Sequence, residues 1–194
     1  MSLFPNYHRA PVTFISAKNA TWVDDHNQTY SDLSSGIGVY NVGANNPEVL
    51  TALTDQAANI WHVPNLYQNP LQETVAQKLG GDTYTTYFAN SGAEANEAAI
   101  KLARLATGKS TIISFSNSFH GRTYAAMAAT GQDSIHAGLP MLAGFKYATF
   151  NDINSLQALI NDDVAAIMLE LIQGEGGVIP AEPEFVAALV KLAH

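Results

Sequence analysis

Apolar residues recur at short spacing near the N-terminus and in longer runs further along the chain. Three short runs bounded by turn residues predict a small β-meander over residues 12–15, 21–23 and 29–33. Residues 34–46 are rich in Gly, Ser and Asn, which predicts a loop.

Two Asn-Pro pairs mark the starts of helices, because Asn is a good N-cap and proline fits the first helical turn. Asn46-Pro47 precedes an apolar stripe of helical spacing. Asn69-Pro70 begins a second predicted helix, which ends at Gly80-Gly81.

From residue 83 onward, strands and helices alternate. The predicted strands are 83–88, 111–115, 145–150 and 164–169, and the predicted helices are 94–106, 124–129, 152–160 and 184–193. Continuous apolar strands that alternate with helices are typical of a largely parallel, buried sheet, so we predict an α/β fold.

Composition excludes several classes of function. Nine basic residues against seventeen acidic ones leave a formal charge of -8, without the basic stripe that nucleic acids require. No apolar run approaches the roughly 20 residues that span a bilayer, and residues 1–14 lack the pattern of a signal peptide. There is no cysteine, which fits a cytosolic protein, and the six histidines show no metal-ligand spacing, so we predict no metal site.

The segment Asn90–Glu97 follows a predicted strand and opens a helix. Ser91 and Glu94 have the spacing of a capping box, and Gly92 and Ala93 keep the first turn free of bulky side chains. A helix start of this kind favours an anion through its free N–H groups and aligned peptide dipoles. An ordinary capped helix that binds nothing would show the same features.

The loop Ser118–Thr123 follows the strand predicted over residues 111–115, at the sheet edge where open α/β sheets bind ligands. Phe119 could stack on a flat cofactor, and Arg122 could hold a carboxylate through two parallel hydrogen bonds. Taken alone, the loop fits equally well with Phe119 in the core and Arg122 in a surface ion pair.

The segment Glu170–Gly177 follows the strand predicted over residues 164–169. A carboxylate at the end of a buried strand is costly unless it is paired, and the three glycines allow close approach to a ligand. A tight turn with a solvated Glu175 is the alternative.

In this order, the three segments resemble those of the class III, pyridoxal-phosphate (PLP)-dependent aminotransferases. The early strand Thr21–Asp25 and the loop Gly36–Val39, similar to the family's active-site loop, extend the resemblance over nearly the whole chain. Within the class, the loops Phe119–Thr123 and Gln173–Gly177 look most like those of acetylornithine-type members, with ornithine-type members close behind.

The resemblance implies a role for each candidate residue, with PLP as the cofactor. Ser91, Gly92, Ala93, Phe119 and His120 would bind PLP: the phosphate on the N–H groups of the helix start and the pyridine ring under Phe119. The residues that line the substrate side would be Arg122, Glu170 and Glu175, with Arg122 holding a carboxylate and Glu175 influencing substrate choice.

The resemblance also implies a reaction and a fold. The terminal amino group of N-acetylornithine would pass to 2-oxoglutarate, giving glutamate and a semialdehyde, in arginine biosynthesis by a cytosolic homodimer. The fold would be the PLP-transferase fold type I large domain over residues 47–194, incomplete and with helices on both faces of its sheet. Residues 1–46 would form the N-terminal segment with short strands and the active-site loop.

Some positions depart from the family pattern. Asn46 stands where relatives carry His, and Leu171 where they carry Pro. The Schiff-base lysine and the acidic partner of the pyridine nitrogen follow later in the family, so we expect no catalytic lysine within these 194 residues and no activity from them alone. Transfer from ornithine, succinylornithine or 4-aminobutyrate is an alternative, as is a non-catalytic fragment that binds a phosphate-bearing ligand.

Overall fold

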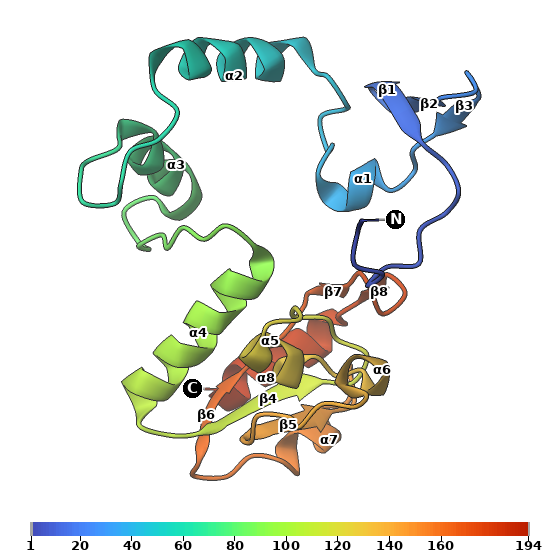
Figure 1. Cartoon of the computed structure of the whole chain (residues 1–194). Helices are drawn as coiled ribbons and strands as arrows, with labels where there is room; N and C mark the ends of the chain where they lie inside the picture. Colours follow the sequence, from blue (N-terminus) through green and yellow to red (C-terminus); the bar gives the residue numbers. More distant parts are fainter. Residues whose placement is uncertain (1, 194) are drawn as a thin grey trace. The chain divides into compact units, whose positions relative to one another are not determined.

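The computed structural model describes residues 2–193, which form two compact units. The first unit extends to Lys78 and the second begins at Leu79 (Figure 1). The predicted boundary between residues 46 and 47 falls inside the first unit, and it stays a prediction.

The first unit begins with the predicted antiparallel meander. Its strands are β1 (Phe14–Lys18), β2 (Thr21–Asp24) and β3 (Thr29–Ser31), with β2 in the centre. The rings of Phe14, Trp22 and Tyr30 pack edge to face on one side of it, with centroids 5.0 and 5.3 Å from that of Phe14.

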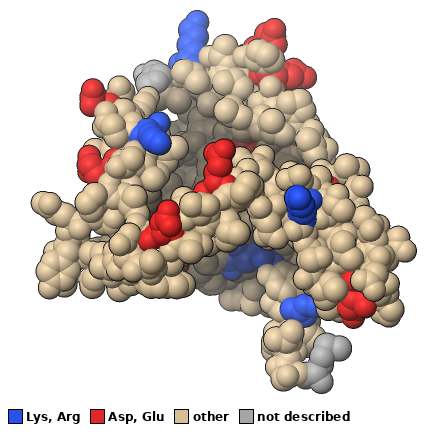
Figure 2. Space-filling model, turned by 90° about the horizontal axis from the view of Figure 1, so that it is seen from above, with Lys and Arg blue, Asp and Glu red and all other residues tan. Residues whose placement is uncertain are grey.

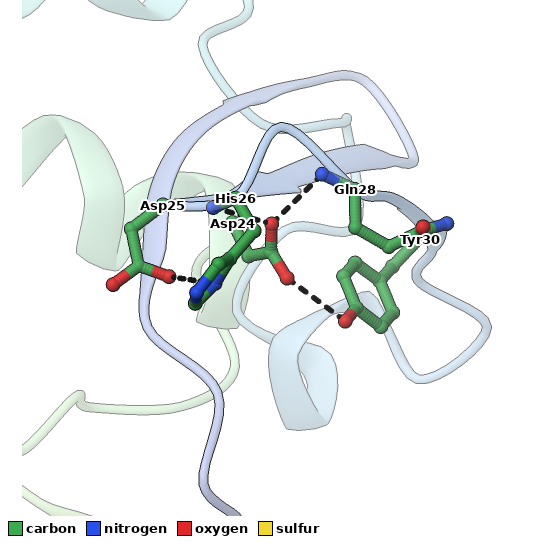
Figure 3. A network of polar contacts seen from close by, with 5 residues as sticks. All are labelled: Asp24, Asp25, His26, Gln28 and Tyr30. Carbon is green, nitrogen blue, oxygen red and sulfur yellow. Dashed lines mark hydrogen bonds and ion pairs between the residues drawn. The ribbon is translucent and has the colours of Figure 1, made fainter.

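Asp24 holds the turn between β2 and β3 together (Figure 3). Its buried carboxylate accepts hydrogen bonds from the backbone N–H groups of His26 (2.9 Å) and Gln28 (2.8 Å) and from the Tyr30 hydroxyl (3.0 Å). Burial by itself raises the pKa of Asp24, but these bonds outweigh it and the pKa is lowered. Both oxygens are therefore used by the turn itself.

Residues 34–46 form a loop, as predicted, except for one unexpected turn. In α1 (Ser35–Gly38), Gly36 and Ile37 have φ values of 59° and 60°, so part of the turn is left-handed. Two longer helices follow, α2 (Pro47–Asn59) and α3 (Pro70–Gly80), at the predicted positions. Asn46 caps α2 by accepting hydrogen bonds from the N–H groups of Glu48 and Val49.

A parallel sheet forms the centre of the second unit. Its strands, in spatial order, are β5 (Phe145–Ala148), β4 (Thr111–Phe115) and β6 (Val164–Ile167). Both neighbours run parallel to β4, and every residue of β4 is buried. The predicted parallel sheet is therefore confirmed, with β4 fully buried and its two neighbours partly buried.

Helices pack on both faces of this sheet, because side chains along β4 alternate in direction. Ile113 and Phe115 lie in one core with α7 (Ile153–Gln157) and α8 (Pro183–Ala193). Ile112 lies in the other core with α4 (Gly92–Thr107) and α5 (Tyr124–Ala129).

The prediction of a strand over residues 83–88 is wrong. A strand is held by hydrogen bonds to a neighbour, and within residues 2–193 no segment pairs with this one. Three short elements were not predicted: α6 (Asp133–His136) and the strands β7 (Ile172–Gln173) and β8 (Ile179–Pro180), which form a hairpin.

Among the residues that the structure describes, no helix is both long and apolar enough to cross a membrane. On the face shown in Figure 2, uncharged residues make up most of the visible surface.

Candidate functional site

The start of α4 has the predicted cap. The Ser91 side chain accepts a hydrogen bond from the N–H of Glu94 (3.2 Å), while the Glu94 carboxylate accepts one from the N–H of Asn90 (2.6 Å). In the usual capping box this second bond goes to the N-cap residue itself, whereas here it reaches one residue further back.

Two backbone donors at this helix start have no protein partner. The N–H groups of Gly92 and Ala93 make no hydrogen bond within residues 2–193, as expected for the first positions of a helix. A Cβ atom added at Gly92 would meet nothing within 4 Å, so the space beside this residue is open. The helix start can therefore admit an anion directly against its backbone.

The loop of residues 119–123, called here the aromatic loop, lies against this helix start. At Gly121, where φ is +129°, an added Cβ would lie 2.7 Å from the Cβ of Ala93. Only glycine allows this approach. The His120 carbonyl accepts a hydrogen bond from the Asn96 side chain (2.7 Å), and the His120 N–H donates to Thr130 Oγ1 (2.9 Å).

The helix start and the aromatic loop line an open cavity of about 550 Å³, a size typical of small-molecule sites. Its lining consists of Ser91, Gly92, Ala93, Asn96, Phe119, His120, Gly121, Arg122 and Thr123. The structure thus brings together six of the eight predicted site residues.

The other two predicted site residues, Glu170 and Glu175, do not line this cavity. Glu170 follows β6 and accepts a hydrogen bond from the N–H of Phe119 (3.0 Å), so it supports the aromatic loop. Burial raises the pKa of Glu170, and the nearby charge of Glu175 adds to the effect. Glu175 is exposed, between β7 and β8.

His120 is held in its neutral form. Its side chain is 5% exposed, and its Nε2 atom is buried without a hydrogen-bond partner among the described residues. Burial lowers its pKa from the usual 6.5 to about 4.

Acid is therefore expected to destabilise the chain through His120. Between pH 6.5 and about 4, the unfolded chain binds a proton at His120 that the folded chain does not bind. The free energy of unfolding therefore decreases as the pH is lowered through this window, and it is unaffected above the window. The full loss is at most about 3 kcal/mol. Urea unfolding followed by circular dichroism at pH 7 and pH 4.5 checks this, with His120→Asn, which cannot titrate, as the control. An equal fall in both proteins would contradict it.

Sequence reasoning assigned no role to several residues that hold the site. Asn96, Glu97 and Thr130 each bond to the aromatic loop or to the start of α5. Asn96 and Glu97 lie within the first motif, at positions that a helix places next to a neighbouring segment, but nothing in one sequence names that segment. Thr130 gives no signal, because nothing near it in the sequence names its bonding partners.

The chain matches the family described as aminotransferase class-III over residues 4–194. It belongs to this family. The second unit accordingly has part of the PLP-transferase fold type I.

Several curated relatives are described as acetylornithine aminotransferases. The chain is 57% identical to an acetylornithine aminotransferase of Streptococcus mutans over 97% of its length, and 53% identical to one of Bacillus subtilis, also over 97%. It spans 50% of each of these relatives, so it corresponds to about half of their length.

Solved structures agree on the fold. The N-acetylornithine aminotransferase of Stenotrophomonas maltophilia superposes with a TM-score of 0.78 at 34% identity, covering 96% of this chain and 48% of that one. The taurine:2-oxoglutarate aminotransferase of Bifidobacterium kashiwanohense, solved with PLP and glutamate, gives 0.88 at 26% identity, covering 98% and 50%.

Proposed function

We propose that the full-length protein containing this chain is a PLP-dependent aminotransferase that moves the terminal amino group of N-acetylornithine to 2-oxoglutarate. The cavity between an open helix start and an aromatic, arginine-bearing loop carries this proposal, because it offers sites for a phosphate, a flat ring and a carboxylate together. The relatives at 57% and 53% identity support the choice of amine donor.

PLP fits the residues that line the cavity. The N–H groups of Gly92 and Ala93 would hold its phosphate, with Ser91 beside them, and Phe119 would stack on its ring. Neutral His120 would present an uncharged wall. When bound, PLP supplies an electron sink for the amino group's carbon, and the protein supplies orientation and electrostatics.

Three further residues would affect substrate binding, Arg122 from the cavity lining and the two glutamates from outside it. Arg122 would hold a carboxylate through two parallel, charge-assisted hydrogen bonds. Glu170 would keep the aromatic loop in place through Phe119, and the exposed Glu175 would influence which amine donor is accepted. We further propose that the full-length enzyme works as a cytoplasmic homodimer in arginine biosynthesis, with glutamate and a semialdehyde as products.

Removing one backbone N–H that would donate a hydrogen bond to the phosphate should weaken PLP binding. Gly92→Pro deletes a single N–H at the first helical position, where proline is tolerated and where Pro47, Pro70 and Pro183 already begin three other helices. Loss of a hydrogen bond to a charged group should raise the Kd of PLP roughly 10-fold or more. Gly92→Ala keeps the N–H and adds a methyl group beside the proposed phosphate position, so it measures the effect of added bulk apart from the loss of the donor. If fluorescence titration gives both variants the same affinity, the phosphate lies elsewhere.

The amine donor is tested on the full-length enzyme. N-acetylornithine should give a higher kcat/KM than ornithine, succinylornithine or 4-aminobutyrate, with 2-oxoglutarate as the acceptor. A preference for another donor would leave the proposed class of reaction in place, but the proposed amine donor would then be wrong. Calorimetry that shows inorganic phosphate binding as tightly as PLP would favour the non-catalytic alternative instead.

A further inference from the structure

Glu97 bonds to the end of the aromatic loop without lining the cavity. Its Oε1 atom accepts three hydrogen bonds: from the Thr123 hydroxyl (2.7 Å) and from the N–H groups of Ala125 (2.8 Å) and Ala126 (3.1 Å). Glu97 lies on α4, and all three donors lie at the beginning of α5. One carboxylate oxygen therefore joins the two helices, and these three hydrogen bonds are called here the joint between α4 and α5.

This carboxylate replaces the cap that α5 lacks. Thr123 stands at the N-cap position, but its side chain makes no capping bond within its own helix and donates to Glu97 instead. The free N–H groups of a first turn need an acceptor when they are shielded from water, and a negative charge is the most favourable one. Glu97 meets this need from a neighbouring helix.

The joint fixes the aromatic loop at its C-terminal end. Residues 125–129 of α5 are buried, so this helix is anchored in the core. At the other side of the loop, Asn96, the residue before Glu97, donates to the His120 carbonyl. Two consecutive residues of α4 thus hold the loop on the helix whose first turn presents the N–H groups of Gly92 and Ala93.

The charge of Glu97 suits this role. Burial by itself raises the pKa of Glu97, but the bonds from Thr123, Ala126 and Ala125, with the nearby charge of Lys101, outweigh it, so the pKa is lowered. The group is ionised at neutral pH, and its hydrogen bonds are charge-assisted.

We propose that Glu97 is a positioning residue, which sets the spacing between the phosphate-binding start of α4 and the Phe119 and Arg122 wall of the cavity. The role of that spacing rests on the proposed function. The joint itself does not, because it is made entirely by this chain's own atoms.

The test uses the full-length protein, first without PLP. In Glu97→Ala, amide hydrogen exchange should become faster in peptides covering residues 119–126 and stay unchanged in β4 and β6. The Kd of PLP should rise and kcat/KM should fall by ~10- to 100-fold, the cost of a small misplacement of binding groups. Glu97→Gln keeps an oxygen acceptor and should recover most of both values.

Glu184→Ala is the matched control, since it removes an exposed carboxylate from the first turn of another helix, α8. Unchanged exchange over residues 119–126 in Glu97→Ala would overturn the inference, as would faster exchange spread evenly over the sheet or no recovery in Glu97→Gln. Failure of the unmodified protein to bind PLP would instead overturn the proposed function, and the exchange result would still decide whether the joint exists.

Discussion

Replacing Arg122 with Ala in the full-length enzyme is expected to lower kcat/KM for 2-oxoglutarate by roughly 10- to 100-fold for each hydrogen bond lost, because a bond to a charged group contributes about 1.5–3 kcal/mol. Arg122 is exposed at the cavity lining, in the same loop as Phe119 and Gly121. A planar guanidinium there can hold both oxygens of a carboxylate, which fixes the substrate's orientation as well as its affinity.

Arg122→Lys is the control for this prediction. It keeps the positive charge but loses the two-pronged geometry, so its kcat/KM should lie between those of the unmodified enzyme and Arg122→Ala. The affinity for PLP, measured separately, should change little in either variant, because the phosphate is assigned to the backbone of α4. Equal kcat/KM values for every substrate would remove Arg122 from the site.

Local signals in the sequence were enough to predict much of the fold. The Asn46 cap of α2 and the end of α3 at Gly80 appear as predicted, because each depends on residues close in sequence. The parallel sheet was predictable as well, since an apolar run such as Val164–Leu169 has no polar side to expose.

Features that depend on distant partners were not predictable. Residues 83–88 have the composition of a strand, but pairing decides whether a strand forms, and no partner lies within residues 2–193. The left-handed backbone at Ile37 also contradicts local preference, since β-branched residues avoid positive φ. The active-site role of Gly36–Val39 stays a prediction.

The candidate site likewise has features that depend on residues close in sequence and features that depend on distant partners. Ser91, Gly92 and Ala93 were identified because a helix start is a local pattern with a known affinity for anions. The Asn96 side chain donates to the His120 carbonyl, and the Ala125 N–H donates to the Glu97 carboxylate, so these bonds join residues 24 and 28 positions apart. A single sequence does not show which distant residues bond to each other. The residues that line the cavity could therefore be predicted, whereas Asn96 and Glu97, which hold the aromatic loop in place, could not.

The polypeptide of residues 1–194 alone is expected to show no aminotransferase activity. Transamination with PLP needs a lysine whose amine bonds to the cofactor's aldehyde carbon and then moves the proton. The six lysines, none of which belongs to the described lining of the cavity, are Lys18, Lys78, Lys101, Lys109, Lys146 and Lys191. Lys101, on the same helix as Gly92, stands nine positions further along, which is about 13 Å of helix.

The surroundings of these lysines argue the same way. Five of the side chains are exposed and therefore solvated, and Lys146 lies early in β5, where its charge interacts with Asp163. Exposed apolar residues on α4, such as Leu102 and Leu105, also favour self-association of this polypeptide, which would not supply the missing amine.

The measurement is to add PLP to the purified polypeptide, reduce with borohydride and locate labelled lysines by mass spectrometry, with the full-length enzyme treated in parallel. The polypeptide should give only scattered, substoichiometric labelling, which is the reaction of exposed amines with any aldehyde. The full-length enzyme should give one labelled lysine at a position beyond residue 194. One fully labelled lysine within residues 1–194, together with turnover of N-acetylornithine, would contradict both the prediction and the assignment of the cavity, because a catalytic amine would then exist where the structure places none.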